Sequence, residues 1–151
     1  MNDTAKPALF RMPIEVRWRD LDAFNHVNNA SFLTFLEEAR IRWFDSLGTE
    51  WVTETIAPLL AAVQINYRQP IPYPANIAVE LFAQRVGNTS VTIGHRILKQ
   101  AQSLPPTGSG DERPEDATLY ADGHVVMVWI DRASASPIPL PDMVRKAVAS
   151  G

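Results

Sequence analysis

The chain has 151 residues, and its 14 Lys and Arg against 17 Asp and Glu give a net charge of −3. It contains no cysteine, which excludes disulfide bonds, thiolate metal sites and a cysteine nucleophile. The acidic balance disfavours nucleic-acid binding, and no apolar run is long enough to span a membrane, so we expect one cytoplasmic domain over residues 1–151.

The chain begins with a strand pattern followed by a polar segment. Apolar residues alternate with charged ones from residue 14 onward, with Ile14, Val16 and Trp18 on one face, and this period of two predicts a half-buried strand. Residues 20–29 (Asp-Leu-Asp-Ala-Phe-Asn-His-Val-Asn-Asn) are polar and have poor helix and strand propensity. The segment is therefore predicted to connect the strand to the next element.

A long helix is predicted after this segment. Asn28 or Asn29 can cap its start, and Gly48 suits its end. Glu38 and Arg42 have the i,i+4 spacing of an ion pair. The apolar residues form an arc wide enough to predict burial on most sides of the helix. This arc consists of Phe32, Leu33, Phe35, Leu36, Ala39, Trp43, Phe44 and Leu47.

The second half of the chain has the pattern of an antiparallel sheet. Runs rich in β-branched and aromatic residues alternate with turn signals, and short connections favour antiparallel neighbours. The class is therefore α+β, with about five strands wrapped around one long central helix and a core over about residues 12–132. The predicted strands are 60–67, 77–86, 91–98 and 119–130, followed by a short helix over 141–149, and the Pro- and Gly-rich residues 101–116 are expected to be a mobile loop.

The polar segment is the best candidate for a site of chemistry. It lies at the amino end of a helix, where unpaired N–H groups and the helix dipole stabilise negative charge. Asp22 is placed to act there as a nucleophile or general base for acyl transfer. Asp20 and Asp22 are equally well explained as turn and capping residues. The residues alone therefore leave both interpretations open.

A resemblance to a known family favours the chemical interpretation of Asp22. Residues 17–29 (Arg-Trp-Arg-Asp-Leu-Asp-Ala-Phe-Asn-His-Val-Asn-Asn), with Phe32-Leu33 and Leu-Glu-Glu-Ala-Arg at 36–40, resemble the opening of hotdog-fold acyl-CoA thioesterases. The most similar branch is the 4-hydroxybenzoyl-CoA thioesterase group. Weaker similarities at residues 66–74 and 85–90 extend the resemblance over about residues 14–130.

The resemblance implies a fold, a reaction and a set of site residues. It implies a hotdog fold whose protomers pair their sheets into a homodimer or homotetramer, with the sites between protomers. It implies hydrolysis of an acyl-CoA without a metal or other cofactor, Asp22 as the nucleophile or base, and the backbone N–H of Asn29 as the group that polarises the thioester carbonyl. The same resemblance places four residues near coenzyme A, namely Gly87, Asn88, Thr89 and Ser90.

Several of these residues also have simpler explanations. His26 is a candidate general base, but a residue that shapes the turn fits as well. Asn29 can serve as a helix cap, and Gly87-Asn88 is first a hairpin signal. Phe24 and Tyr67 are candidates for the acyl pocket, which leaves aromatic and medium aliphatic acyl groups open.

Two departures from the family's patterns bear on the substrate. Many members of the 4-hydroxybenzoyl-CoA group carry glycine where this chain has Asn25, and acyl-carrier-protein thioesterases carry a functional asparagine where it has Phe24. The second departure favours coenzyme A thioesters over carrier-protein thioesters. The alternatives are a hotdog domain that binds an acyl thioester or aromatic ligand without turnover, or a carrier-protein thioesterase.

The long strands 77–86 and 119–130 suggest edges that a dimer would cover.

Overall fold

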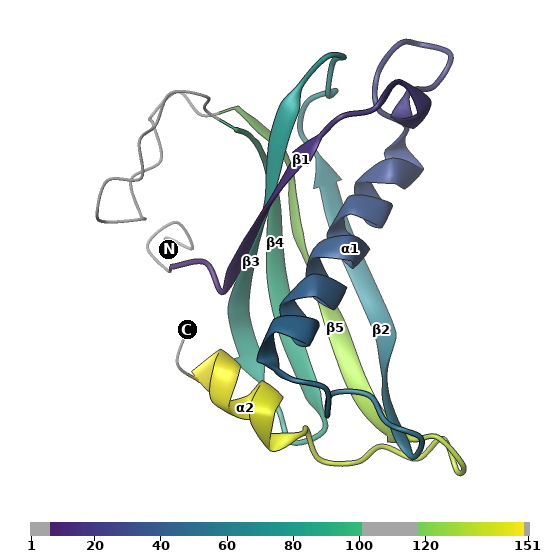
Figure 1. Cartoon of the computed structure of the whole chain (residues 1–151), viewed down its shortest axis with the longest axis vertical. Coiled ribbons are helices and arrows are strands. Elements are labelled where there is room, and N and C mark those ends of the chain that lie inside the picture. Colours follow the sequence, from purple (N-terminus) through teal and green to yellow (C-terminus); the bar gives the residue numbers. More distant parts are fainter. Residues whose placement is uncertain (1–6, 101–117, 150–151) are drawn as a thin grey trace.

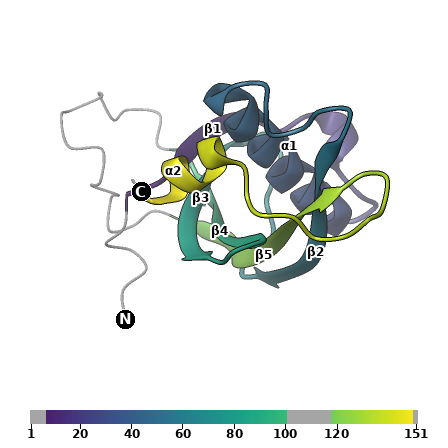
Figure 2. The ribbon, with the colours of Figure 1, turned by 90° about the horizontal axis from the view of Figure 1, so that it is seen from below.

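The protein is described by a computed structural model that covers residues 7–100 and 118–149, in which one helix lies across a five-stranded antiparallel sheet (Figure 1). The strand order is β1-β3-β4-β5-β2, and the strands curve around one side of the helix (Figure 2). This arrangement confirms the α+β class. The elements are β1 (Phe10–Glu15), a 3-10 turn η2 (Trp18–Asp20), α1 (Asn29–Leu47), β2 (Ile56–Tyr67), β3 (Asn76–Val86), β4 (Ser90–Lys99), β5 (Leu119–Asp131) and α2 (Asp142–Ala149).

Helix α1 begins where its cap residues predict. The side chain of Asn28 accepts a hydrogen bond from the N–H of Ala30 at 2.8 Å, and Gly48 ends the helix with a φ of 134°. Glu38 and Arg42 form the predicted ion pair at 2.7 Å. The prediction that the helix is buried on most sides is wrong for the single chain. Its sheet-facing side is buried, but Leu33 and Ile41 are exposed, because the sheet covers only one side of the helix.

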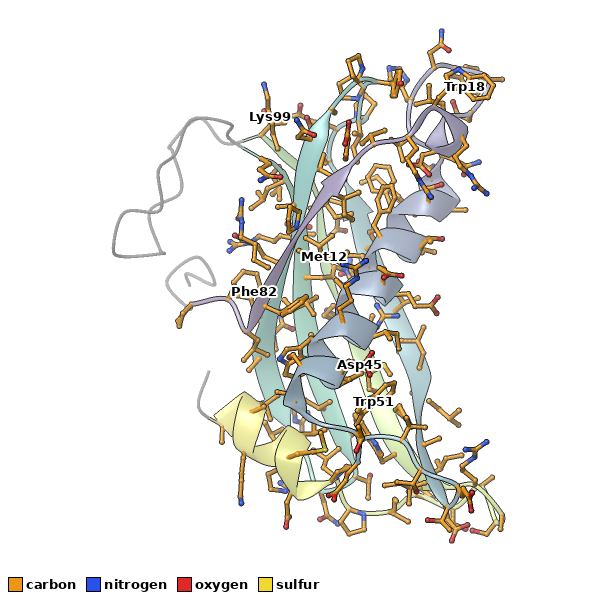
Figure 3. All side chains as sticks on the ribbon, in the orientation of Figure 1. Met12, Trp18, Asp45, Trp51, Phe82 and Lys99 are labelled. Carbon is orange, nitrogen blue, oxygen red and sulfur yellow. The ribbon has the colours of Figure 1, made fainter. Side chains whose placement is uncertain are left out.

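An aromatic cluster fixes the carboxyl end of α1 to the sheet. The ring of Phe44 stacks on Trp51 at 5.1 Å and meets the ring of Trp129 edge-on at 5.5 Å. The indole N–H groups are also satisfied, since Trp129 donates to the carbonyl of Trp51 at 2.8 Å and Trp51 donates to Asp45 at 3.1 Å. Asp45 and Trp51 lie near the end of α1 in Figure 3. These contacts make the helix and the sheet one packed unit.

The first strand begins and ends earlier than predicted. It ends at Glu15, and Trp18 is 76% exposed instead of lying on the buried face. The cause is local, because the carboxylate of Asp20 accepts the N–H of Arg17 at 2.8 Å. The N–H of Asp20 in turn donates to the carbonyl of Arg17 at 2.9 Å and closes a 3-10 turn. Strand β2, in contrast, begins earlier than predicted and includes Pro58. Proline is tolerated there because β2 lies at the edge of the sheet.

The sheet edges differ from those expected. The predicted edge strands, β3 and β5, both lie inside the sheet, while β1 and β2 form its edges. Hydrophobic pattern reveals that a strand is long, but not which neighbours it has. Strand β2 exposes several large apolar side chains, and these are Leu59, Leu60, Val63 and Tyr67.

Two other predictions concern the second half of the chain. The short terminal helix is confirmed as α2, which buries Val144 and Val148 against the core. The expected loop over 101–116 lies outside the described residues. Among the described residues, no helix has both the length and the apolar character needed to cross a bilayer.

A buried histidine on β4 makes stability depend on pH. His95 is 2% exposed, and its Nε2 lies 3.2 Å from the carbonyl oxygen of Gln64. No described residue forms a hydrogen bond with its Nδ1. Burial, together with the positive charge of Arg40, lowers the pKa of His95 to about 4. The unfolded chain takes up this proton near its ordinary pKa of 6.5, well above the pH at which the folded chain does.

We therefore expect the free energy of unfolding to fall as the pH drops from about 6.5 to about 4, by up to a few kcal/mol. In His95→Gln the amide can still donate to the carbonyl of Gln64 but does not titrate. This variant should lose less stability over the same interval. Urea unfolding of both proteins at several pH values measures the difference, and parallel curves would contradict the prediction.

Candidate active site

The polar segment before α1 folds back on itself. The N–H of Asp22 donates to the carbonyl of His26 at 2.9 Å, and the N–H of Asn28 donates to the carbonyl of Asp20 at 2.8 Å. An isolated bridge between Leu21 and Val27 lies between these bonds. The segment is therefore a small closed loop at the amino end of α1, near the top of Figure 1.

Asp22 is half-buried, and its two carboxylate oxygens have different surroundings. Oδ1 accepts the N–H of Phe24 at 2.8 Å, which is the turn role that the sequence left open. No described residue donates a hydrogen bond to Oδ2. The turn role and a chemical role are therefore compatible, because one oxygen fixes the side chain and the other is available to a ligand.

Asp20 has a different function from Asp22. It is buried, and its carboxylate forms an ion pair with Arg17 at 2.9 Å in addition to accepting the N–H of the same residue. Burial raises the pKa of Asp20, but the hydrogen bonds and charge of Arg17 outweigh it, so the net pKa lies below the ordinary value. Asp20 is thus a structural residue that shapes the approach to the loop.

The start of α1 offers an unbonded N–H group. Asn28 accepts the N–H of Ala30 with its side chain and the N–H of Ser31 with its carbonyl, both at 2.8 Å. No described residue accepts the N–H of Asn29. Tyr67 on β2 donates its hydroxyl to the carbonyl of Asn29 at 3.2 Å and so ties the edge strand to this helix end.

Two exposed side chains complete the loop. The ring of Phe24 is 80% exposed, and His26 is also exposed and meets Asp22 through its main chain only. Asn25 has a φ of 62°, the left-handed conformation that asparagine tolerates better than most residues. Asparagine here therefore preserves a backbone shape that glycine also adopts.

The residues expected near coenzyme A lie elsewhere. Residues 87–89 form the predicted hairpin turn between β3 and β4, closed by the N–H of Gly87 donating to the carbonyl of Ser90 at 2.8 Å. The carbonyl of Asn88 accepts from Arg145 of α2 at 2.9 Å. Helix α2 lies at the end of the molecule where α1 finishes (Figure 1). A single protomer thus brings Asp22, Asn29 and Tyr67 to one end and the hairpin to the other.

Sequence reasoning missed one buried charge on α1. Arg40 is 6% exposed and lies on the sheet-facing side of the helix. Its spacing of four residues from both Leu36 and Phe44 was the signal that could have identified it. For metal binding, no cluster of three or more His, Asp or Glu side chains occurs within 7–100 and 118–149.

Comparison with known proteins agrees with this fold. The model of the thioesterase-like superfamily matches residues 16–148. The long-chain acyl-CoA thioesterase FadM of Escherichia coli K12 is 30% identical over 135 residues, covering 88% of this chain and 92% of the relative.

Two solved structures are also similar to this chain in sequence and in fold. The PA2801 protein of Pseudomonas aeruginosa is 33% identical, with a TM-score of 0.77 over 94% of this chain and 99% of that one. A thioesterase from Thermus thermophilus, solved in complex with coenzyme A and Zn, is 28% identical, with a TM-score of 0.72 over 94% and 98% of the two chains. By sequence and by fold, then, the chain belongs to the thioesterase-like superfamily and has its hotdog architecture.

Proposed function

We propose that the protein hydrolyses acyl-CoA thioesters to a free acid and coenzyme A, with Asp22 as the catalytic carboxylate. One observation carries this proposal. The available Oδ2 of Asp22 and the unbonded N–H of Asn29 both lie at the amino end of α1, where the closed loop meets the helix. The activity named for the relative FadM supports the choice of an acyl-CoA substrate.

The arrangement suits acyl transfer to water. The thioester oxygen accepts the N–H of Asn29, where the helix dipole stabilises the negative charge that develops on it. Asp22 either attacks the carbonyl carbon through Oδ2 or takes a proton from the water that does so. The carbon–sulfur bond then breaks. Where water attacks, the proton that Asp22 took from it goes to the leaving thiolate. Where Asp22 attacks, water then hydrolyses the acyl–aspartate anhydride, which releases the acid, restores the carboxylate and supplies the proton for the thiolate. No metal or other cofactor is expected in this reaction.

A second copy of the chain supplies the coenzyme A contacts in this proposal. The exposed apolar edge of β2 is suited to pairing with its own copy about a two-fold axis. Antiparallel pairing of this kind puts the Asp22 end of one protomer next to the hairpin end of the other. The loop 87–90 of the second copy then lies near the nucleotide of the substrate, and Phe24 and Tyr67 line the acyl pocket.

Thiol release from a panel of acyl-CoAs tests the proposed activity. The panel includes short, medium, long and aromatic acyl groups, with EDTA in a parallel set of assays. We expect steady-state turnover of at least one class, unchanged by EDTA. Tight stoichiometric binding without thiol release would contradict the proposal and favour a non-catalytic binding domain, while turnover of acyl-carrier-protein thioesters alone would favour that substrate. A cytoplasmic location stays a prediction.

A further inference from the structure

The burial of Arg40 needs an explanation. The residue occupies one sheet-facing row of α1 with Phe32, Leu36 and Phe44, all of which are essentially fully buried. A charged side chain in such a row is costly unless a partner satisfies it. Structural stability alone would favour an apolar residue at this position.

Arg40 lacks such a partner in the described parts of the chain. No residue of 7–100 or 118–149 accepts a hydrogen bond from its guanidinium or forms an ion pair with it. Burial lowers the pKa of Arg40, and Glu37, one turn earlier, opposes this effect through its charge. An arginine stays charged even so, and the guanidinium N–H groups are available to an acceptor from outside the described residues.

Arg40 also lines a groove between α1 and the edge strand β2. The groove has a volume of about 240 Å³. The helix and β2 contribute its walls, which consist of Leu33, Thr34, Glu37, Arg40, Leu60 and Val63. Leu33 lies one turn from Asn29, so the Leu33 end of the groove is the end nearer to the proposed catalytic residues. Its end near Leu33 is mostly apolar, and farther along it holds the cationic Arg40 close to the acidic Glu37.

We propose that this groove holds the acyl group of the substrate and that Arg40 binds an oxygen at the far end of that group. The substrate class is then an acyl-CoA whose acyl chain carries a terminal carboxylate or hydroxyl. This inference rests on the proposed thioesterase function and extends it to substrate choice. It makes Arg40 a specificity-determining residue that touches the substrate remote from the reacting bond.

The separation of Asn29 and Arg40 along the helix fits a medium acyl chain. At a rise of about 1.5 Å per residue, Arg40 lies about 16 Å from Asn29 along the helix axis, and long helical side chains point back toward the amino end. The apolar side chains of Leu33, Leu60 and Val63 can contact the methylene groups between the two ends. A terminal oxygen of the acyl group then accepts hydrogen bonds from the guanidinium of Arg40.

The test compares acyl-CoAs that differ only at the terminal carbon. At each even chain length from hexanoyl to dodecanoyl, kcat/KM is measured for the plain, ω-hydroxy and ω-carboxy acyl-CoA. We expect the wild type to prefer an oxygenated substrate over its plain counterpart by about tenfold to a hundredfold at one or more lengths, the value of a hydrogen bond to a charged group. Preference for the ω-carboxy form alone identifies an anionic ligand, and preference for both forms identifies any acceptor oxygen.

Arg40→Met removes the donors while keeping a long apolar side chain. It should bring the ratio of kcat/KM for the oxygenated substrate to kcat/KM for its plain counterpart close to one, and Arg40→Lys should restore part of the preference. Because an apolar side chain replaces a buried charge, the variant should fold at least as well, which thermal unfolding checks. Arg42→Met, on an exposed part of the same helix, is the matched control and should retain the wild-type preference.

Two results would overturn this inference. The first is a wild type without preference for oxygenated chains at any length. The second is an Arg40→Met variant that loses all substrates equally or separates into monomers, which would assign Arg40 to protomer assembly. Neither result affects the proposed thioesterase function, which depends on plain acyl-CoA turnover and on Asp22.

Discussion

Asp22→Asn is expected to lower kcat/KM for acyl-CoA hydrolysis by about 10²- to 10⁴-fold, the range typical of a lost general base. Asparagine keeps a carbonyl oxygen that can accept the N–H of Phe24, so the loop before α1 should retain its shape. It removes the negative charge and the basic oxygen at Oδ2. Thiol release from one acyl-CoA substrate at a time measures the loss of kcat/KM. The unfolding curves of the variant should coincide with those of the wild type.

Asp45→Asn is the matched control for this substitution. Asp45 lies at the opposite end of α1 and accepts the indole N–H of Trp51, a role that asparagine can also fill (Figure 3). This variant should keep the wild-type kcat/KM. If Asp22→Asn hydrolysed acyl-CoA at the wild-type rate, Asp22 would not be the catalytic carboxylate, whatever the effect at Asp45.

Gly123→Ala is expected to cost about 3 kcal/mol or more of the free energy of unfolding. Gly123 on β5 has a φ of 148°, where side chains are rarely tolerated, and an added Cβ would overlap the carbonyl oxygen of Gln64 on β2. Relieving this overlap requires the two strands to separate, which adds backbone strain to lost strand pairing. Urea unfolding of the variant and the wild type measures the cost.

Gly94→Ala provides the comparison on the neighbouring strand. Its Cβ would lie 2.6 Å from the amide nitrogen of Gln84, the far end of a flexible side chain that can move away. We expect a clearly smaller loss of stability than at Gly123. Equal losses at the two positions would show that the contact with the Gln64 carbonyl is not what makes glycine necessary on β5.

The sequence predicted those parts of the fold that depend on local interactions. The N-cap at Asn28 and the Glu38–Arg42 pair involve neighbours along the helix, so spacing was sufficient to identify them. The early end of β1 is also local, but alternation in residues 14–19 gave no sign that Asp20 would bind Arg17. A polar side chain that binds the backbone can thus end a strand whose hydrophobic pattern continues.

The site was predictable only in part. The residues at the start of α1 are close in sequence, and the resemblance identified them together as candidates. Strand pairings across the whole chain determine which strands form the sheet edges. For the same reason, the spacing of residues could not show at which end of the molecule the hairpin 87–90 lies. Arg40 was not predicted to be buried because a helical arginine is ordinarily exposed, and its burial depends on how α1 packs on the sheet.

The hydrogen bond from the N–H of Phe24 to Asp22 has a consequence for the energetics of the proposed reaction. A free aspartate samples several rotamers, and fixing one of them costs conformational entropy. Here the turn has already fixed the rotamer as part of folding, so substrate binding does not need to supply that free energy. In the proposed reaction the carboxylate is thus preorganised, and the stability of the closed loop before α1 lowers the barrier that the bound thioester must cross.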